Sequence, residues 1–255
     1  MSDSDKPSIP QGYGPSAYGE AFADVYDEWY ERISDVGATV AGVQALAGGG
    51  PVLELGVGTG RLALPLAEAG VETWGVDASP AMLARLRVKP GADGLRIVQA
   101  DMAAPPLAAT ARFAVVFCAF NTFFNLHVPG DQASCLAWSA RALAPDGRLA
   151  IEVFVPSEGD STPEGPVSVR SIESDRVVLS VTERDVEAQT VTGQLVDLSA
   201  AGVRLRPYRI RYLFPAQLDD LAAEVGLRLV DRWASWAGEP FTDDSPNHVS
   251  VYGRA

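Results

Sequence analysis

The feature that most constrains this chain is a glycine-rich segment, "VLELGVGTGRLALPLAEAG", at residues 52–70. A short stretch with strand character runs into glycines at positions 56, 58 and 60, and a pattern with helical spacing follows at once. Glycine has no Cβ, so such a turn can bring the backbone close to a ligand. A strand, a tight turn and a helix in this order begin a βαβ unit.

The alternation of strands and helices continues downstream. Strands are predicted at residues 52–55, 72–76, 95–99, 114–119 and 148–155, with helices between them at about 60–69, from 79 onward and at about 131–143. Ser79 is a capping residue and Pro80 follows at the first helical position. This order predicts an α/β protein with a Rossmann-like, mostly parallel sheet that is covered on both faces.

One residue disagrees with this pattern. Pro65 lies inside the helix expected at 60–69 and cannot donate a hydrogen bond to the carbonyl of Arg61. We therefore expect a local bend in this helix.

The hydrophobic period changes to about two after Pro156. Three or four antiparallel strands are predicted between residues 167 and 213, then a helix at 215–225 and two final strands, "LRLVDRWASW" and "HVSVYGR". Alternate arginines in one of these strands are expected to form a solvated sheet face; they are Arg204, Arg206, Arg209 and Arg211.

These patterns divide the chain into four parts. Residues 1–16, rich in Ser, Pro and Gly, are expected to be a mobile arm. Residues 17–48 have helical spacing and many tyrosines, and are expected to form a lid. Residues 49–156 and 213–255 are predicted to form the Rossmann-like domain, and 157–212 an inserted set of antiparallel strands that serves as a specificity lid or a dimer element.

Composition limits the partners. The 255 residues include 20 basic and 33 acidic ones, a net charge of −13, which argues against binding to nucleic acid or an anionic membrane. The chain has neither an apolar run long enough to span a membrane nor a signal-like N-terminus, so we expect a cytoplasmic protein, monomeric or homodimeric. Cys118 is expected to be a buried core residue, no disulfide framework is indicated, and no spacing predicts a metal site.

The ligand of a parallel sheet binds beyond the carboxyl ends of its strands. Asp77 follows the second expected strand, 21 residues after Gly56, a spacing suited to a carboxylate that accepts hydrogen bonds from ribose hydroxyls. Asp101 follows the third strand and suits an adenine amino group. His127 lies near the predicted pocket mouth, and histidine is the side chain whose charge changes nearest neutral pH.

Several nucleotide ligands use a glycine-rich turn after a first strand. A nicotinamide fingerprint requires a third glycine where Arg61 stands, and a Walker loop requires a Gly-Lys-Ser/Thr ending that is absent. Glu54 directly before the turn opposes a phosphate and favours a cationic ligand.

At these residues the chain resembles the class I S-adenosylmethionine-dependent methyltransferases of small-molecule type. Five motifs appear in the order of that family: "LELGVGTGR", "GVDASPAML", "QADM", "FAVVFCAFNTFFNL" and "RALAPDGRLAIEVF". The resemblance implies a seven-stranded sheet in the order 3-2-1-4-5-7-6 with the seventh strand antiparallel. The segment "YGEAFADVYDEWY" is similar to the N-terminal lid of sugar-amine and glycine N-methyltransferases, and the chain is also similar to antibiotic-tailoring methyltransferases.

The resemblance implies S-adenosylmethionine as the cofactor and S-adenosylhomocysteine as its product. It places the methionine moiety on the glycine turn, the ribose on Asp77 and the adenine next to Met82. The residues implied to bind the cofactor are Tyr18, Tyr26, Glu54, Gly56, Val57, Gly58, Thr59, Gly60, Arg61, Asp77, Ala78, Met82, Asp101, Met102, Ala119 and Phe120. The candidates for substrate binding are Trp29, Tyr30, Asn121 and Phe124, and the candidates for catalysis are His127 and Tyr26.

The predicted activity is transfer of a methyl group to an N, O or C nucleophile of a small metabolite, in bacterial secondary metabolism. Two alternatives stay open at the level of the sequence: a nicotinamide-dependent oxidoreductase and a non-catalytic S-adenosylmethionine-binding protein. A nucleic-acid amino-group methyltransferase would carry two prolines after its fourth strand, and here the residues are Asn121-Thr122-Phe123-Phe124.

Overall fold

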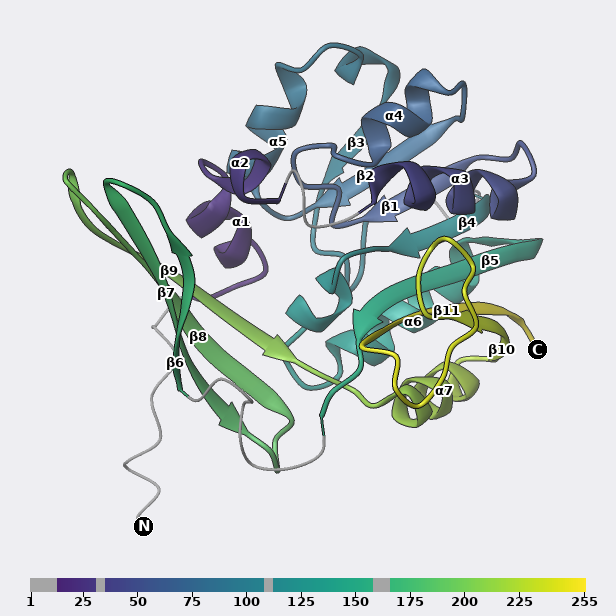
Figure 1. The fold of residues 1–255 in the computed structure, drawn as a ribbon. Coiled ribbons are helices and arrows are strands. Elements are labelled where there is room, and N and C mark those ends of the chain that lie inside the picture. Colours follow the sequence, from purple (N-terminus) through teal and green to yellow (C-terminus); the bar gives the residue numbers. More distant parts are fainter. Residues whose placement is uncertain (1–12, 31–34, 108–111, 158–165) are drawn as a thin grey trace.

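The computed structural model describes residues 13–30, 35–107, 112–157 and 166–255, and it contains two separate sheets (Figure 1). The larger sheet has seven strands in the order β10-β11-β5-β4-β1-β2-β3. Its strands are β1 (Val52–Leu55), β2 (Thr73–Asp77), β3 (Arg96–Gln99), β4 (Phe113–Cys118), β5 (Leu143–Phe154), β10 (Leu227–Trp233) and β11 (Asn247–Arg254). Only β11 runs antiparallel to its neighbours, so the predicted fold class and strand order are confirmed.

Helices cover both faces of this sheet, because both faces of its central strands are apolar. Val52 and Leu53 of β1 point to opposite sides, and neither is exposed to solvent. The Val52 side packs against α3 (Val36–Ala47) and α4 (Ala63–Glu68), and the Leu53 side against α6 (Asp131–Ala142) and α7 (Pro215–Glu224). In the described part of the chain, no helix is long and apolar enough to cross a membrane.

The sequence predicted the start of the helix after β2 correctly, but not the start of the helix after β1. The helix α5 (Pro80–Arg87) begins as predicted, with the Ser79 hydroxyl accepting a hydrogen bond from the Met82 amide at 3.1 Å. The expected bend at Pro65 is wrong, because α4 begins only at Ala63 and places Pro65 in its first turn. Amides of the first turn have no acceptor within the helix, so a proline there removes no hydrogen bond.

The smaller sheet is an antiparallel meander of four strands, as the change of period predicted. It consists of β6 (Val167–Ile172), β7 (Arg176–Asp185), β8 (Thr190–Ser199) and β9 (Gly202–Arg211). The N-terminal helices α1 (Ala17–Phe22) and α2 (Tyr26–Tyr30) lie between this sheet and the carboxyl ends of the larger one (Figure 1). Residues 1–12 of the expected arm lie outside the described residues.

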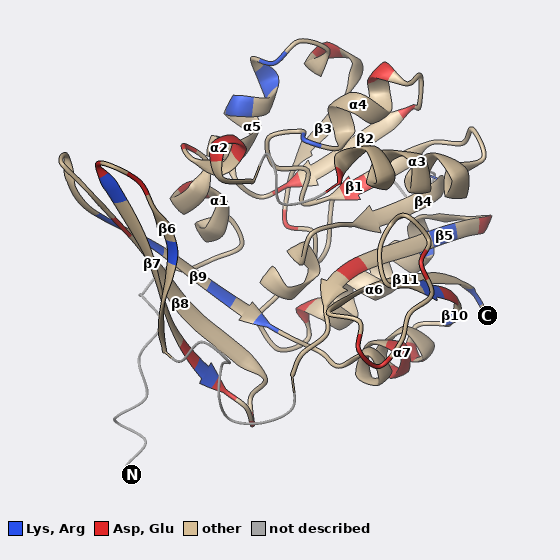
Figure 2. Ribbon diagram, in the orientation of Figure 1, with Lys and Arg blue, Asp and Glu red and all other residues tan. Residues whose placement is uncertain are grey.

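The predicted solvated arginine face is wrong for Arg206, whose side chain is only 2% exposed. The helices α1 and α2 cover this face of the sheet, and Glu28 of α2 and Asp24 between the two helices pair with its arginines. Figure 2 shows how the acidic and basic residues are distributed over these elements. Arg206 Nη1 donates to Asp24 Oδ1 and to the Ala21 carbonyl, both at 2.6 Å. Arg204, two residues earlier, reaches the same carboxylate but stays 56% exposed.

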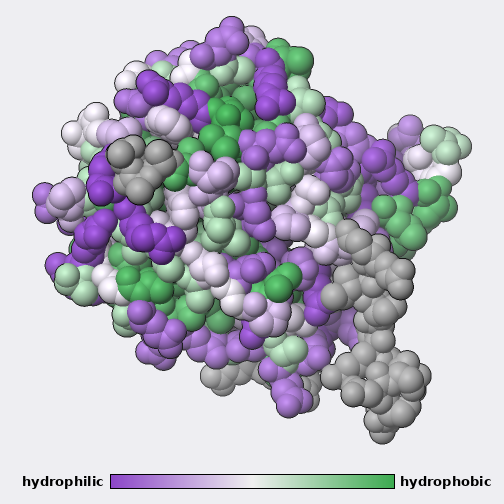
Figure 3. Space-filling view, turned by 180° about the vertical axis from the view of Figure 1, so that it is seen from behind, coloured by the Kyte–Doolittle hydropathy of each residue, from purple (hydrophilic) through white to green (hydrophobic). Residues whose placement is uncertain are grey.

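The other face of the small sheet has no such cover among the described residues. Aliphatic side chains are exposed there on the edge strands β6 and β9, among them Ile172 at 73% and Val203 at 67%. Figure 3 shows an apolar patch on this part of the surface.

Candidate active site

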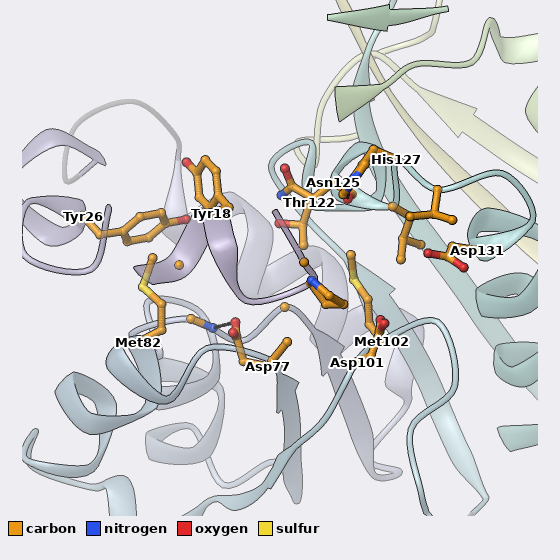
Figure 4. Close-up of a pocket in the computed structure, with 18 residues that line it drawn as sticks. Tyr18, Tyr26, Asp77, Met82, Asp101, Met102, Thr122, Asn125, His127 and Asp131 are labelled. Atoms are coloured by element: carbon orange, nitrogen blue, oxygen red, sulfur yellow. Dashed lines mark hydrogen bonds between the residues drawn. The ribbon is translucent and has the colours of Figure 1, made fainter. Parts of the chain in front are cut away.

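A pocket opens at the carboxyl ends of β1, β2 and β4, beneath the helices α1 and α2 (Figure 4). The loops that follow the strands supply its floor and one wall, and the N-terminal helices supply the facing wall. This is the place where a parallel sheet of this kind binds its ligand.

The glycine turn and Asp77 form one hydrogen-bonded unit at the floor of this pocket. The Gly58 amide donates to Asp77 Oδ2 and the Ser79 amide to Asp77 Oδ1, each at 2.8 Å. Burial raises the pKa of the Asp77 carboxyl, while these two amides lower it. Gly56 has φ +76°, and a Cβ on it would lie 2.2 Å from Thr122 Cγ2, so only glycine fits.

Glu54 lies behind the turn as a buried carboxyl. Its side chain is 5% exposed, and its Oε2 has no hydrogen-bond partner within the described residues. Burial raises the pKa of Glu54 to about 8, Arg61 lowers it and Asp77 raises it. A positively charged ligand at the turn would favour the ionised form of this carboxyl.

The end of β4 is held in a strained conformation. Phe120 and Asn121 have φ +54° and +63°, which are unfavourable for residues other than glycine. Glu152 Oε2 accepts hydrogen bonds from the Phe120 amide at 2.8 Å and from Trp236 Nε1 at 3.0 Å. The Asn121 side chain accepts from the Phe154 amide at 2.7 Å. These contacts direct the chain into the short helix η3 (Thr122–Asn125), which lines the pocket.

Aromatic residues of α1 and α2 close the opposite side. The Tyr18 hydroxyl donates to the Tyr30 hydroxyl at 3.1 Å, and burial raises the pKa of Tyr18 well above its usual value. The Tyr26 ring stacks on Tyr30, and the Tyr30 ring meets Phe120 edge-on. Tyr18 and Tyr26 face the pocket in Figure 4, so these helices form part of the site.

Polar contacts attach these helices to the Rossmann-like domain. Glu20 Oε1 accepts from the Ser79 hydroxyl at 2.7 Å, at the start of α5. The Thr59 hydroxyl, in the glycine turn, donates to Asp27 Oδ1 at 2.6 Å, and Asp27 also pairs with Lys89 at 2.8 Å. The helices α1 and α2 therefore contact the same turn and helix start that Asp77 organises.

The far wall contains His127, Asn125 and Asp131. His127 Nδ1 lies 3.1 Å from the Asn125 carbonyl oxygen, and the ring of Tyr13 meets the imidazole edge-on. Burial and the nearby Asp101 raise the pKa of Asp131, and His127 lowers it. The described lining contains three carboxylates and neither lysine nor arginine, so the pocket is electronegative.

The structure brings ten of the predicted site residues together around this pocket. They are Tyr18, Tyr26, Gly56, Gly58, Asp77, Ala78, Met82, Asp101, Met102 and His127. The other predicted residues are not part of this lining: Trp29, Tyr30, Glu54, Val57, Thr59, Gly60, Arg61, Ala119, Phe120, Asn121 and Phe124. Phe124 packs against Phe154 in the core, and Trp29 packs beneath the arginines of the small sheet.

Sequence reasoning missed eight residues of the lining. They are Gly14, Pro15, Gly19, Thr122, Asn125, Leu126, Val128 and Asp131. The "FNTFFNLH" segment after β4 already indicated the region of Thr122 and Asn125. Nothing in the sequence identifies Gly19, whose role depends on a contact with α5: a Cβ there would lie 2.3 Å from Ser79 Cβ.

Comparison with known proteins agrees with this geometry. Residues 52–147 match a family model described as a methyltransferase domain. The chain is 31% identical over 152 residues to the uncharacterized methyltransferase YdaC of Bacillus subtilis, covering 58% of this chain and 80% of that protein. It is 28% identical over 243 residues to the cypemycin N-terminal methyltransferase of a Streptomyces species, covering 94% and 98% of the two chains.

A solved methyltransferase structure is similar to this chain over almost its full length. The CcbJ methyltransferase from Streptomyces caelestis superposes with a TM-score of 0.86 at 37% identity, covering 95% of this chain and 100% of that one. A Rossmann-like sheet with an acidic pocket at its strand ends therefore defines the class: an enzyme that binds an adenosyl cofactor. Within that class, the chain belongs to the S-adenosylmethionine-dependent methyltransferases.

The residues present fit this cofactor. S-adenosylmethionine has a net positive charge, ribose hydroxyls and an adenine amino group, and the described lining offers three carboxylates that can accept hydrogen bonds and favour a positive charge. A nicotinamide dinucleotide would instead bring a pyrophosphate, whose negative charge the three carboxylates of that lining would oppose. The oxidoreductase alternative gains no support, since these relatives are methyltransferases.

Proposed function

We propose that this pocket binds S-adenosylmethionine together with a small amine, and that the enzyme methylates the amine nitrogen. The observation that carries the proposal is the charge of the described lining, which contains Asp77, Asp101 and Asp131 and no basic side chain. An amine is cationic at neutral pH and suits such a pocket, whereas a carboxylate or phosphate substrate would be repelled. Among N, O and C acceptors, nitrogen is therefore favoured.

Individual residues have distinct parts in this proposal. Asp77 accepts hydrogen bonds from the ribose hydroxyls, and Met82 and Met102 border the adenine. When bound, the cofactor supplies an electrophilic methyl group, which is attached to a positively charged sulfur. The enzyme holds the amine in line with that methyl group, and such positioning contributes about 7–11 kcal/mol. Tyr18 and Tyr26 shield the site from water.

The remaining parts of the proposal concern the wider role. Residues 17–48 act as a lid, and residues 157–212 contribute to substrate selection. The two segments 49–156 and 213–255 together form one Rossmann-like domain. We place the enzyme in the cytoplasm of a bacterium, as a monomer or homodimer that acts in secondary metabolism and not on nucleic acid. The full-length similarity to the cypemycin N-terminal methyltransferase supports both an amine acceptor and this metabolic setting.

The test is a methylation assay with isotopically labelled S-adenosylmethionine and a panel of acceptors. The panel contains amino sugars, peptides with free N-termini, catechols and indoles, and mass spectrometry reports the labelled methyl. We expect label on amines. Label on catechols or indoles alone would refute the choice of nitrogen, and failure of S-adenosylmethionine to bind in calorimetry would refute the assignment of the pocket.

The variant Asp77→Asn tests the cofactor part of the proposal separately. We expect its affinity for S-adenosylmethionine to fall by about 2–4 kcal/mol, because hydrogen bonds to a charged group contribute roughly 1.5–3 kcal/mol each. Calorimetry measures the change, and Asp93→Asn is the control, since Asp93 is an exposed carboxylate outside the pocket lining. Equal affinities of the two variants would contradict the role of Asp77.

A further inference from the structure

The hydrogen bonding of His127 determines which of its two ring nitrogens carries a proton. Nδ1 lies 3.1 Å from the carbonyl oxygen of Asn125. A carbonyl oxygen only accepts hydrogen bonds, so Nδ1 must be the protonated nitrogen in the neutral ring. Nε2 then carries a lone pair that can accept a proton. In this tautomer, Nε2 can act as a general base.

The position of His127 supports the same reading. The residue follows η3, lines the pocket and is only 9% exposed. It lies across the pocket from Asp77 in Figure 4, on the same side as Thr122 and Asn125. The edge-on ring of Tyr13 fixes the orientation of the imidazole, and the Tyr13 hydroxyl is itself held by the Arg209 amide at 3.0 Å.

We propose that His127 is the general base that removes the proton from the acceptor ammonium before methyl transfer. This inference rests on the proposed function, because it requires an amine acceptor. Nε2 of His127 takes the proton and leaves a free lone pair on the acceptor nitrogen. That lone pair forms the new N–C bond while the C–S bond breaks and its electron pair stays on sulfur. The imidazolium then returns the proton to water, and the product leaves as a methylated ammonium.

Two carboxylates lie on the His127 side of the pocket. They are Asp101 and Asp131, and Asp131 interacts electrostatically with His127. From β9, Arg209 approaches through its backbone amide, which is bonded to Tyr13. A base contributes about 10²–10⁴-fold to a proton-transfer step.

A purely structural role for His127 predicts different results, so the two can be separated. We expect His127→Ala to slow single-turnover methylation of an amine acceptor by about 10²–10⁴-fold at pH 7, with affinity for S-adenosylmethionine within twofold of the wild type. Added imidazole should restore the rate at least tenfold. Asp93→Asn is the control: its exposed side chain lies outside the pocket lining, so this variant should keep the wild-type rate.

The dependence of the methylation rate on pH is a second test of this proposal. The wild-type rate should level off once the imidazole is neutral, while the rate of His127→Gln should keep rising with pH as free amine accumulates. A variant rate within threefold of the wild type, or a loss that imidazole does not rescue and that follows a loss of thermal stability, would overturn the proposal.

One measurement needs no acceptor and keeps the inference separate from the proposed function. Nitrogen NMR of the free enzyme reports the protonation of each imidazole nitrogen, and we expect Nδ1–H for His127. A proton on Nε2 would overturn the base even if amines are methylated. Conversely, Nδ1–H together with methylation of catechols alone would refute the amine acceptor and not the geometry of His127.

Discussion

At the scale of single residues, the active site depends on positions that have two roles. Asp77 faces the pocket and also accepts the amides of Gly58 and Ser79, so it shapes the glycine turn that the cofactor approaches. Gly56 gives that turn its left-handed backbone and leaves room for Thr122. The motif spacing alone predicted that Asp77 contacts the ribose. The close approach of Gly56 to Thr122 was not predicted, because it depends on how the chain folds back after β4.

Replacement of Gly56 by alanine should therefore be costly. A left-handed conformation costs a non-glycine residue roughly 1–2 kcal/mol, and the new Cβ would lie 2.2 Å from Thr122 Cγ2, which adds about 1–3 kcal/mol of overpacking. We expect the free energy of unfolding, measured by urea titration, to fall by about 2–5 kcal/mol.

Gly48→Ala is the matched control for this prediction. Gly48 has a similar backbone, with φ +54°, but a Cβ there would meet no atom within 4 Å. Its variant should lose only the conformational part, about 1–2 kcal/mol. If both variants lose the same amount, the contact between the turn and η3 is not what restricts position 56.

At the scale of elements, the N-terminal segment 17–30 is attached to the small sheet by ion pairs that the sequence did not reveal. Arg176 pairs with Asp197 at 2.6 Å and with Glu28 at 2.9 Å, and Arg206 joins Asp24 to the same sheet. Arg176 lowers the pKa of Asp197 through a hydrogen bond. Because these partners lie far apart in the chain, the period of two in β9 could predict a strand but not which face α1 and α2 would cover.

Arg206→Met should loosen this attachment. Loss of one partner of a fully buried ion pair typically costs 3–5 kcal/mol; Asp24 remains 33% exposed, so we expect about 2–4 kcal/mol here. Hydrogen exchange of residues 17–30 should rise with the loss of stability. Arg204→Met removes a 56% exposed partner of the same carboxylate and should cost less than about 1 kcal/mol. Equal effects of the two substitutions would show that burial of Arg206 does not matter.

Local signals predicted the elements of this architecture better than their pairing. Period and capping residues identified the strands and the start of α5, because these signals are local. The order of the sheet came from the family resemblance, since pairing is not a local property. Sequence reasoning placed Phe120 and Asn121 in the pocket. Their positive φ angles, which the sequence did not predict, occur where their backbone and side-chain groups bond to Glu152 and Phe154, more than 30 residues away.

At the scale of the whole molecule, an acidic protein places one carboxyl where it cannot easily ionise. Glu54 is in the centre of the large sheet, behind the glycine turn, and burial raises its pKa to about 8 from an unfolded value of 4.5. Between these values the folded state binds a proton that the unfolded state has released. Stability must therefore fall as the pH rises from about 5 to 8. A cationic cofactor at the turn would offset this cost by favouring the charged form.

Glu54→Gln should remove this pH dependence. At pH 5 the variant and the wild type should unfold with similar free energies, because Glu54 is protonated in the folded wild type; at pH 8 the variant should be more stable by a few kcal/mol. Urea titrations at the two pH values measure the difference, with Glu68→Gln on the exposed end of α4 as the control that leaves it unchanged. Calorimetry in two buffers of different ionisation enthalpy should also detect proton release when S-adenosylmethionine binds the wild type at pH 7, and none from position 54 in the variant. A wild-type protein whose stability rises from pH 5 to 8 by the same amount as that of Glu54→Gln would show that Glu54 is already ionised in the folded state.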